Sequence, residues 1–211
     1  MSSKIDFKKT LKYLYSPSSK APVLVEVPEM QFLMIDGKGS PGDSREYLDA
    51  ITSLYPIAFT LKFMSKKESN KDYVVPPLEG LWWAENMNDF IEAKRDGWLW
   101  IMMIMTPEWI TKKMFDHAVK SATEKKPELS KSITKVRLER LHEGKSAQLL
   151  HIGPFSEEHE NIMKIHEFIH QNGGNFDGHR SKHHEIYLSD PRKAKPETMK
   201  TIIRQPFELK K

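Results

Sequence analysis

Hydrophobic periodicity along the chain predicts long amphipathic helices set among strands. Apolar residues recur every three or four positions over 47–61, around Pro56, and again over 156–169. The run 97–105 is apolar on both faces, which is typical of a central strand covered on two sides. We expect a kink at Pro56, because proline lacks the amide hydrogen of the helical ladder. The other predicted strands are 23–28, 31–37, 72–83, 133–140, 146–153, 185–188 and 201–207.

Two local patterns add to this picture. Thr106 followed by Pro107 is typical of a helix start, and apolar spacing over 110–122 marks the inner face of the helix that would follow. The strands predicted at 133–140 and 146–153 are separated by a short polar segment. We therefore expect these two strands to pair as a hairpin.

The predicted elements repeat along the chain. Segment 33–37 before the first long helix matches 149–153 before the later one, and 79–82 after the first matches 185–188 after the later one. Strand, helix, strand, strand given twice predicts an α+β fold with pseudo-twofold symmetry and a shared groove, and such grooves bind ligands. The expected single domain spans 1–211, with a first module at 22–125 after an N-terminal helical extension and a second module at 126–211.

Composition narrows the class of protein. The chain has 211 residues, of which 38% are hydrophobic and 29% are charged, so an ordinary globular core is expected. The absence of cysteine excludes a disulfide scaffold, a thiolate metal site and a cysteine nucleophile. The net charge of +4 comes from scattered lysines and not from a basic stripe, so we expect no nucleic-acid partner. The start resembles no signal peptide and the apolar run 98–105 is too short for a membrane span, so a cytoplasmic protein is expected.

Several stretches together resemble one known family. They are LVEVP at 24–28, FLMIDG at 32–37, AFTLKF at 58–63 and HEIYLSDP at 184–191, with the N-terminal stretch 7–15. Their order and spacing resemble the GyrI-like small-molecule-binding family, and in particular its stand-alone bacterial subgroup. The resemblance implies a duplicated β-α-β-β fold of the SHS2 type with a central ligand groove.

The resemblance also implies a choice of functions. Members of this family serve as effector domains of multidrug-responsive regulators, protect DNA gyrase, or hydrolyse the cyclopropane ring of DNA-alkylating cyclopropanoid antibiotics. No helix-turn-helix segment precedes the domain, so similarity to the stand-alone hydrolases fits best. That reaction needs no metal or organic cofactor. The alternatives are a module that only sequesters planar or amphipathic compounds and a protein that shields gyrase.

Three glutamates are candidates for the chemistry. Glu185 begins an apolar strand and matches the glutamate that the family places at the floor of its groove. It would act as a general base on water, and the competing interpretation is a salt bridge at a strand end. Glu157, in the first turn of the later helix beside Phe155, is the second catalytic candidate, although a glutamate there also suits the helix dipole. Glu79 is the repeat-related partner of Glu185 and is expected in the groove wall.

Aromatic residues gather around the predicted groove strands. They would stack on a flat polycyclic ligand, with methionine as an adaptable neighbour, although about half of them are expected in the core. Trp100 and Tyr187 are the best pocket candidates. A tyrosine such as Tyr187 or a histidine such as His151 would stabilise negative charge on the ligand. The expected ligand-binding set is Trp100, Tyr187, Trp83, Trp98, Met103, Phe155, Trp109, Phe176, His151 and Glu79.

One motif points elsewhere. His166-Glu167-Phe168-Ile169-His170 fits the zinc-binding pattern H-E-x-x-H, which places two histidines on one helix face. The longer pattern needs a third histidine where this chain has Phe176. The apolar stripe of the helix also runs through Ile165 and Ile169, which would turn both histidines toward solvent. We therefore expect no metal site.

Overall fold

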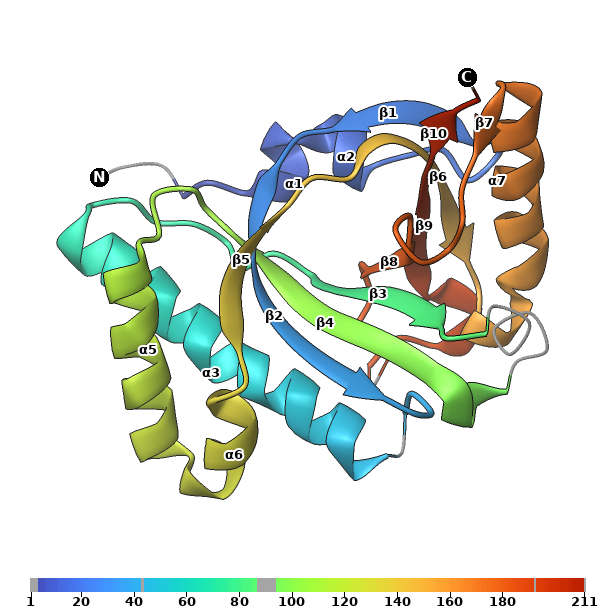
Figure 1. Ribbon diagram of the computed structural model, residues 1–211. Coiled ribbons are helices and arrows are strands. Elements are labelled where there is room, and N and C mark those ends of the chain that lie inside the picture. The colour runs from blue at the N-terminus through green and yellow to red at the C-terminus, as the bar shows by residue number, and fades with distance from the viewer. Residues whose placement is uncertain (1–3, 43, 87–93, 192, 211) are drawn as a thin grey trace.

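An eight-stranded antiparallel sheet forms the centre of the computed structural model, which describes residues 4–42, 44–86, 94–191 and 193–210 (Figure 1). Its strand order is β1-β6-β9-β8-β3-β4-β2-β5. The strands are β1 (Val23–Val27), β2 (Met30–Lys38), β3 (Leu78–Ala84), β4 (Trp98–Thr106), β5 (Arg137–Leu141), β6 (Gly144–Ile152), β8 (His183–Tyr187) and β9 (Lys200–Pro206). A small second sheet pairs β7 (Gly174–Asn175) with β10 (Glu208–Leu209).

Helices cover both faces of this sheet, so the protein is of the α+β class. They are α1 (Phe7–Thr10), α2 (Lys12–Tyr15), α3 (Arg45–Glu68), α5 (Lys112–Lys125), α6 (Ser130–Ile133) and α7 (His159–Gln171). Figure 1 shows α3, α5 and α6 grouped at one end of the sheet and α7 at the other. In the part of the chain that the structure describes, none of the helices combines the length and the apolar character needed to cross a bilayer.

The strand order is symmetric about the boundary between β8 and β3. Exchanging β1, β6, β9 and β8 for β5, β2, β4 and β3 gives the same order in reverse. Two β-α-β-β units that share one sheet would give this order. The strand that precedes each unit pairs with the other unit: β1 pairs with β6, and β5 pairs with β2. The module limits 22–125 and 126–211 stay a prediction.

Two expectations about local structure were wrong. β5 and β6 do not form a hairpin, because β5 pairs with β2 while β6 pairs with β1 and β9. Apolar alternation predicts a strand but not its partner. Thr106 does not begin a helix either: it ends β4, paired with Gln31, and α5 begins only after Thr111, whose hydroxyl accepts a hydrogen bond from the backbone N–H of Met114 at 3.2 Å.

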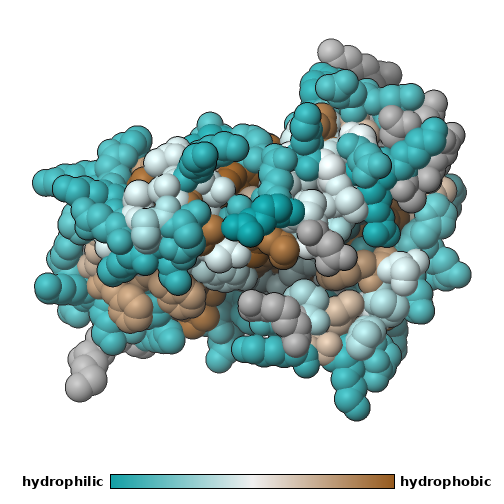
Figure 2. Space-filling model, turned by 90° about the horizontal axis from the view of Figure 1, so that it is seen from below, coloured by the Kyte–Doolittle hydropathy of each residue, from teal (hydrophilic) through white to brown (hydrophobic). Residues whose placement is uncertain are grey.

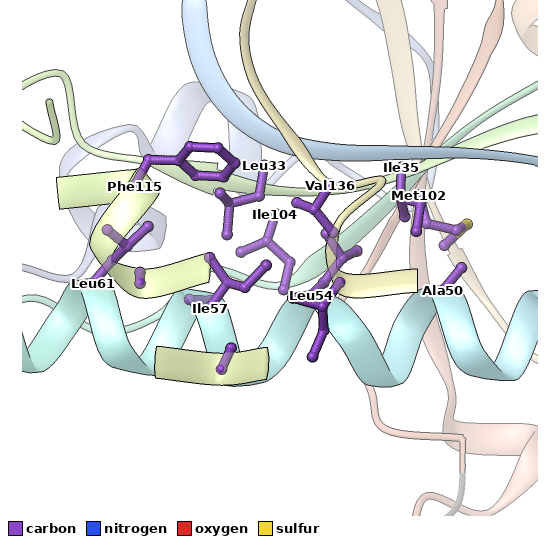
Figure 3. Packing of buried hydrophobic residues seen from close by; sticks show 14 of the residues in the cluster. Leu33, Ile35, Ala50, Leu54, Ile57, Leu61, Met102, Ile104, Phe115 and Val136 are labelled. Carbon is purple, nitrogen blue, oxygen red and sulfur yellow. The ribbon is translucent and has the colours of Figure 1, made fainter. Parts of the chain in front are cut away.

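Helix α3 packs its inner face on the first half of the sheet. Ser44 caps it by accepting from the backbone N–H of Tyr47 at 3.3 Å, and the helix continues through Pro56 to Glu68. Leu54 and its neighbours on α3 point toward β2 and β4, as Figure 3 shows. The labelled side chains in this cluster are Leu33, Ile35, Ala50, Leu54, Ile57, Leu61, Met102, Ile104, Phe115 and Val136.

Helix α7 covers the second half of the same face. Its buried Ile165 and Ile169 pack with Leu149 of β6 and with Ile203 of β9. The central strands β3 and β8 lie between the area under α3 and the area under α7. This spacing leaves room above the centre of the sheet.

The N-terminal segment covers the opposite face through buried polar contacts. Tyr15 donates to Glu79 at 3.0 Å, and one guanidinium nitrogen of Arg204 donates to the carbonyl of Leu14 at 3.0 Å. His184 lies between Glu79 at 3.0 Å and Glu143 at 2.9 Å, so that charged and polar groups satisfy one another without water.

Candidate functional site

A cavity of about 1770 Å³ opens between α3 and α7 above β3 and β8. This volume exceeds the several hundred cubic ångströms that one drug-sized ligand needs. Large apolar side chains stay exposed at its mouth, Phe59, Phe63 and Met163 among them. Figure 2 shows hydrophobic patches that reach the surface on the face seen from below. The aromatic residues that line the cavity include Tyr47, Trp82, Trp98, Phe155, Phe176 and Tyr187.

Strand alternation decides which side chains reach this cavity. On β8, His183, Glu185 and Tyr187 line it, while His184 between them is fully buried on the other face. On β3, Gly80 lies directly opposite Glu185. Since Gly80 carries no side chain, Nε1 of Trp82 and the hydroxyl of Tyr187 can lie above it, next to Glu185.

The carboxylate of Glu185 is held from two sides. Its Oε2 accepts the hydroxyl hydrogen of Tyr187 at 2.8 Å, and its Oε1 lies 3.2 Å from Nε2 of His183. The side chain of Glu185 keeps 16% of its area exposed, against 5% for His183. Glu185 is therefore fixed by its neighbours and still open to a ligand or a water molecule.

Tyr187 connects Glu185 to the aromatic wall. Its hydroxyl accepts a hydrogen bond from Nε1 of Trp82 at 3.1 Å while it donates to Glu185. Burial, followed by the charge of Glu185, raises the pKa of Tyr187 well above its ordinary value. The hydroxyl therefore keeps its proton at neutral pH. Phe155 packs edge-on against the ring of Tyr187, with 5.8 Å between the ring centroids.

Glu158 is another carboxyl group on the cavity wall. It is 4% exposed, and its Oε1 has no hydrogen-bond partner within the described residues. Burial first, and then the charge of Glu185, raises the pKa of Glu158 to about 9, against a smaller opposing effect of its hydrogen bond with Thr201. Glu158 is thus a neutral acid at pH 7. A proton donor and a carboxylate in one cavity are the two groups that general acid and base catalysis need.

Several predicted residues do line this cavity. Glu185, Tyr187, Trp98, Phe155 and Phe176 are all in its wall. The residues come from four separate parts of the chain, and the sheet and α7 bring them together.

Other predicted ligand contacts lie outside the wall of this cavity. Trp100 is fully buried in the core beneath α3, where its ring lies against Gly37. Met103 is fully buried on the opposite face of the sheet, and so is Glu79, which belongs to the polar contacts of His184 and Tyr15. The alignment of the two repeats pairs Glu79 with Glu185, which is an error of one residue. Successive side chains on a strand point to opposite faces, so this error predicts Glu79 on the wrong face of the sheet.

The last four predicted residues also lie outside the cavity wall. Trp83 holds the ammonium of Lys182 over its ring at 4.8 Å. Trp109 packs beside Phe7 and Tyr73 and donates to Ser65 at 2.9 Å. His151 is buried between the amide of Asn161 at 2.9 Å and the carbonyl of Pro154 at 3.1 Å. Glu157 is exposed, so Glu158 replaces it as the second candidate glutamate.

The histidines of the H-E-x-x-H pattern do not both face solvent. His166 lines the cavity and packs on Phe176 with 4.6 Å between ring centroids, whereas His170 is exposed. Burial, followed by the neighbouring His183, lowers the pKa of His166 to about 4. Within the described residues, no group of three or more His, Asp or Glu side chains is arranged to hold a metal ion.

Sequence reasoning missed Glu158, Tyr47 and His183. A signal for Glu158 was present, because it precedes Ile162 by four positions and Ile165 by seven and so shares their helix face. Tyr47 packs edge-on against Trp100 and tilted against Trp82, and only the tertiary structure brings it to the cavity.

Known proteins resemble this chain over nearly its whole length. A conserved protein from Listeria innocua of known crystal structure is 45% identical, with a TM-score of 0.88 over 97% of this chain and 100% of that chain. A crystal structure described as a hydrolase from Listeria innocua is 44% identical, with a TM-score of 0.84 over 97% of this chain and 100% of that chain. The C-terminal domain of EcmrR shares the fold at 11% identity, with a TM-score of 0.54 over 90% of this chain and 98% of that chain.

Family-level comparison agrees with these structural neighbours. Among curated proteins, none matches the chain. The GyrI-like small-molecule-binding domain matches residues 20–207, which include every cavity residue on β3, β8 and α7 described above. The chain therefore belongs to the GyrI-like small-molecule-binding family.

Proposed function

We propose that this protein binds flat, largely apolar small molecules in the cavity and hydrolyses the cyclopropane ring of cyclopropanoid DNA-alkylating antibiotics. The observation that carries the proposal is the pair Glu185 and Glu158, which line one aromatic cavity, with Oε1 of Glu158 buried and without a partner within the described residues. Its similarity to structures described as hydrolases supports an enzymatic role. Detoxification in the cytoplasm goes with this reaction.

Each glutamate has one task in the proposed step. Glu185 takes a proton from a water molecule, whose oxygen bonds to the cyclopropyl carbon. The strained carbon–carbon bond breaks, and its electron pair moves through the conjugated system to the carbonyl oxygen. Glu158 gives its proton to that oxygen, a role for which Tyr187 is not free because its hydrogen is already donated to Glu185.

The remaining residues orient the ligand and the base. Trp82, Trp98 and Phe155 offer ring faces and edges to a planar ligand. Tyr187 and His183 hold the Glu185 carboxylate on a rigid strand. A ligand that fills this space excludes bulk water from the reacting atoms, which strengthens the action of both carboxyl groups.

A second candidate function is sequestration without turnover. The same aromatic wall and the charge of Glu185 suit a planar organic cation, and the volume of about 1770 Å³ leaves room for ligands of several sizes. Shielding of gyrase is a further alternative that the family resemblance implies.

A mass-spectrometric time course tests the proposal. The purified protein is mixed with a cyclopropanoid antibiotic in large excess. Product heavier by one water molecule should accumulate far beyond one equivalent of protein. Unchanged drug, bound at one equivalent or less, would instead support sequestration.

A further inference from the structure

The free oxygen of Glu158 suggests what else this cavity can react with. Glu158 lines the cavity, and its Oε1 is buried and has no partner within the described residues. Buried polar atoms are nearly always hydrogen-bonded, so an unpaired one in a residue that lines a cavity marks a place for a ligand atom. Because the group is a neutral carboxylic acid, its best partner is an oxygen that accepts a hydrogen bond and then a proton.

A second feature restricts the chemistry. Glu185 is held by Tyr187 and His183 and is open to the same cavity, so a water molecule can be activated without a covalent intermediate. The pair thus supplies a proton acceptor at the attacking water and a proton donor at the leaving oxygen. Three-membered rings suit such a site, since ring strain assists bond cleavage.

We propose that the same cavity hydrates aryl-substituted epoxides to vicinal diols, with Glu185 as base and Glu158 as acid. This inference rests on the acid and base roles of the proposed function and extends them to a second class of strained ring. In an epoxide, the oxygen that needs the proton is bonded directly to the carbon under attack. No conjugated carbonyl is then required.

The step is balanced in atoms and charge. Water forms a carbon–oxygen bond at the benzylic carbon and loses one proton to Glu185. The carbon–oxygen bond of the ring breaks, and its electron pair stays on the oxygen, which takes the proton of Glu158. A proton then passes from Glu185 to Glu158, directly or through water, and both groups return to their starting forms. The epoxide gains one water molecule and nothing else is consumed.

The wall of the cavity selects the aryl group. Trp82, Trp98 and Phe155 can stack on or pack edge-on against an aromatic ring beside the carboxyl groups. Aliphatic epoxides of the same size would lose these contacts. We therefore expect turnover of styrene oxide and trans-stilbene oxide to exceed that of 1,2-epoxyhexane by at least about tenfold.

The test uses the full chain with trans-stilbene oxide, and the diol is quantified by chromatography. The wild type should form diol over many turnovers, and Glu158→Gln and Glu185→Gln should each lose about 100-fold or more, in line with the removal of a general acid or base. Glu157→Gln, whose side chain is exposed beside Glu158, should keep the wild-type rate. Unchanged diol formation in Glu158→Gln, or no wild-type diol above the buffer rate, would overturn the inference.

Two further readouts separate this inference from the proposed function. A single turnover in ¹⁸O-labelled water should place the label in the diol, whereas an unlabelled diol would mean attack by Glu185 itself and would overturn the proposed step. The same preparation is assayed with a cyclopropanoid antibiotic. Ring opening of the antibiotic without diol would refute only the epoxide inference, and diol without antibiotic opening would refute only the proposed function.

Discussion

The hydroxyl of Tyr187 donates a 2.8 Å hydrogen bond to the carboxylate of Glu185, two positions earlier on the same strand. Residues two apart on a strand share a face, so β8 itself sets this distance. The indole nitrogen of Trp82 on the neighbouring strand donates in turn to the Tyr187 hydroxyl at 3.1 Å. The base of the proposed reaction is thus oriented by two strands and not by a loop.

Removal of the Tyr187 hydroxyl should slow turnover more than it weakens binding. Tyr187→Phe deletes a hydrogen bond to a charged group, which contributes about 1.5–3 kcal/mol. We expect kcat to fall about 10- to 100-fold, while the Kd of a planar ligand, followed by tryptophan fluorescence, changes less than about threefold. Tyr13→Phe, at an exposed tyrosine, is the matched control. Equal losses in kcat and in affinity would contradict the positioning role.

Gly80 should tolerate no side chain. A Cβ there would lie 2.8 Å from Nε1 of Trp82, 3.1 Å from the hydroxyl of Tyr187 and 3.2 Å from the sulfur of Met102. Gly80→Ala should displace Tyr187 from Glu185 and destabilise the fold by about 1–3 kcal/mol, as overpacking does. Denaturant unfolding measures the stability loss, and kcat of the folded fraction measures the displacement. Wild-type kcat in that fraction would show that Tyr187 does not position the base.

Glu158 should lower the stability of the native protein at neutral pH. Its pKa is raised to about 9 in the folded state from an ordinary value of 4.5, so the unfolded chain releases the proton more easily. Stability is therefore lost as pH rises from 4.5 toward 9. Glu158→Gln should raise the free energy of unfolding at pH 7 by about 1–3 kcal/mol, while turnover falls.

Urea unfolding at pH 5 and pH 7 measures this effect. The gain from Glu158→Gln should be larger at pH 7, and Glu157→Gln should show no such difference because its side chain is exposed. A Glu158→Gln protein no more stable than wild type at pH 7 would mean that Glu158 is ionised in the fold.

The polar contacts on the opposite face should give a second pH dependence. Burial alone would lower the pKa of His184, but the Glu143 carboxylate raises it to about 9. The stability that charged His184 contributes is therefore complete below the ordinary pKa of 6.5 and is lost as pH rises from there toward 9. Despite its burial, Glu143 has its pKa lowered to about 2 by His184 and Arg204, so its stabilisation is lost as pH falls from 4.5 toward 2.

His184→Gln tests the alkaline limb of this dependence. Breaking a buried ion pair should cost about 3–5 kcal/mol at pH 6 and should flatten the decline between pH 6.5 and 9. The comparison is made in a Glu158→Gln background, which removes the titration of Glu158 from the same range. Parallel declines with and without His184→Gln would show that His184 is not charged in the fold.

The fold was largely predictable because strands and helices have distinct periods. The stretch 47–61 gave the core of α3, and the two-sided apolar run at 97–105 gave β4. Strand partners were not predictable, since an apolar pattern does not encode which edge a strand joins. The pairing of β5 with β2 is an example.

The site was predictable only in part, because a shift of one residue along a strand or helix moves a side chain to another face. Glu185 and Tyr187 share one face of β8, and both were named from the sequence. Glu79 was assigned to the same face through an alignment of repeats that was one residue out of phase. Glu157 is named from the sequence and Glu158 is missed, because the helix start is placed without regard to the apolar stripe that Glu158 continues.

The measurement closest to the central claim compares wild type, Glu185→Gln, Glu158→Gln and Glu157→Gln in one antibiotic-hydrolysis time course. Product one water molecule heavier should accumulate over many turnovers in wild type and in Glu157→Gln, because that side chain is exposed outside the cavity wall. Both Glu185→Gln and Glu158→Gln should lose about 100-fold or more in rate while still binding the drug. Full activity in either of these two variants, or no turnover in wild type, would contradict the account.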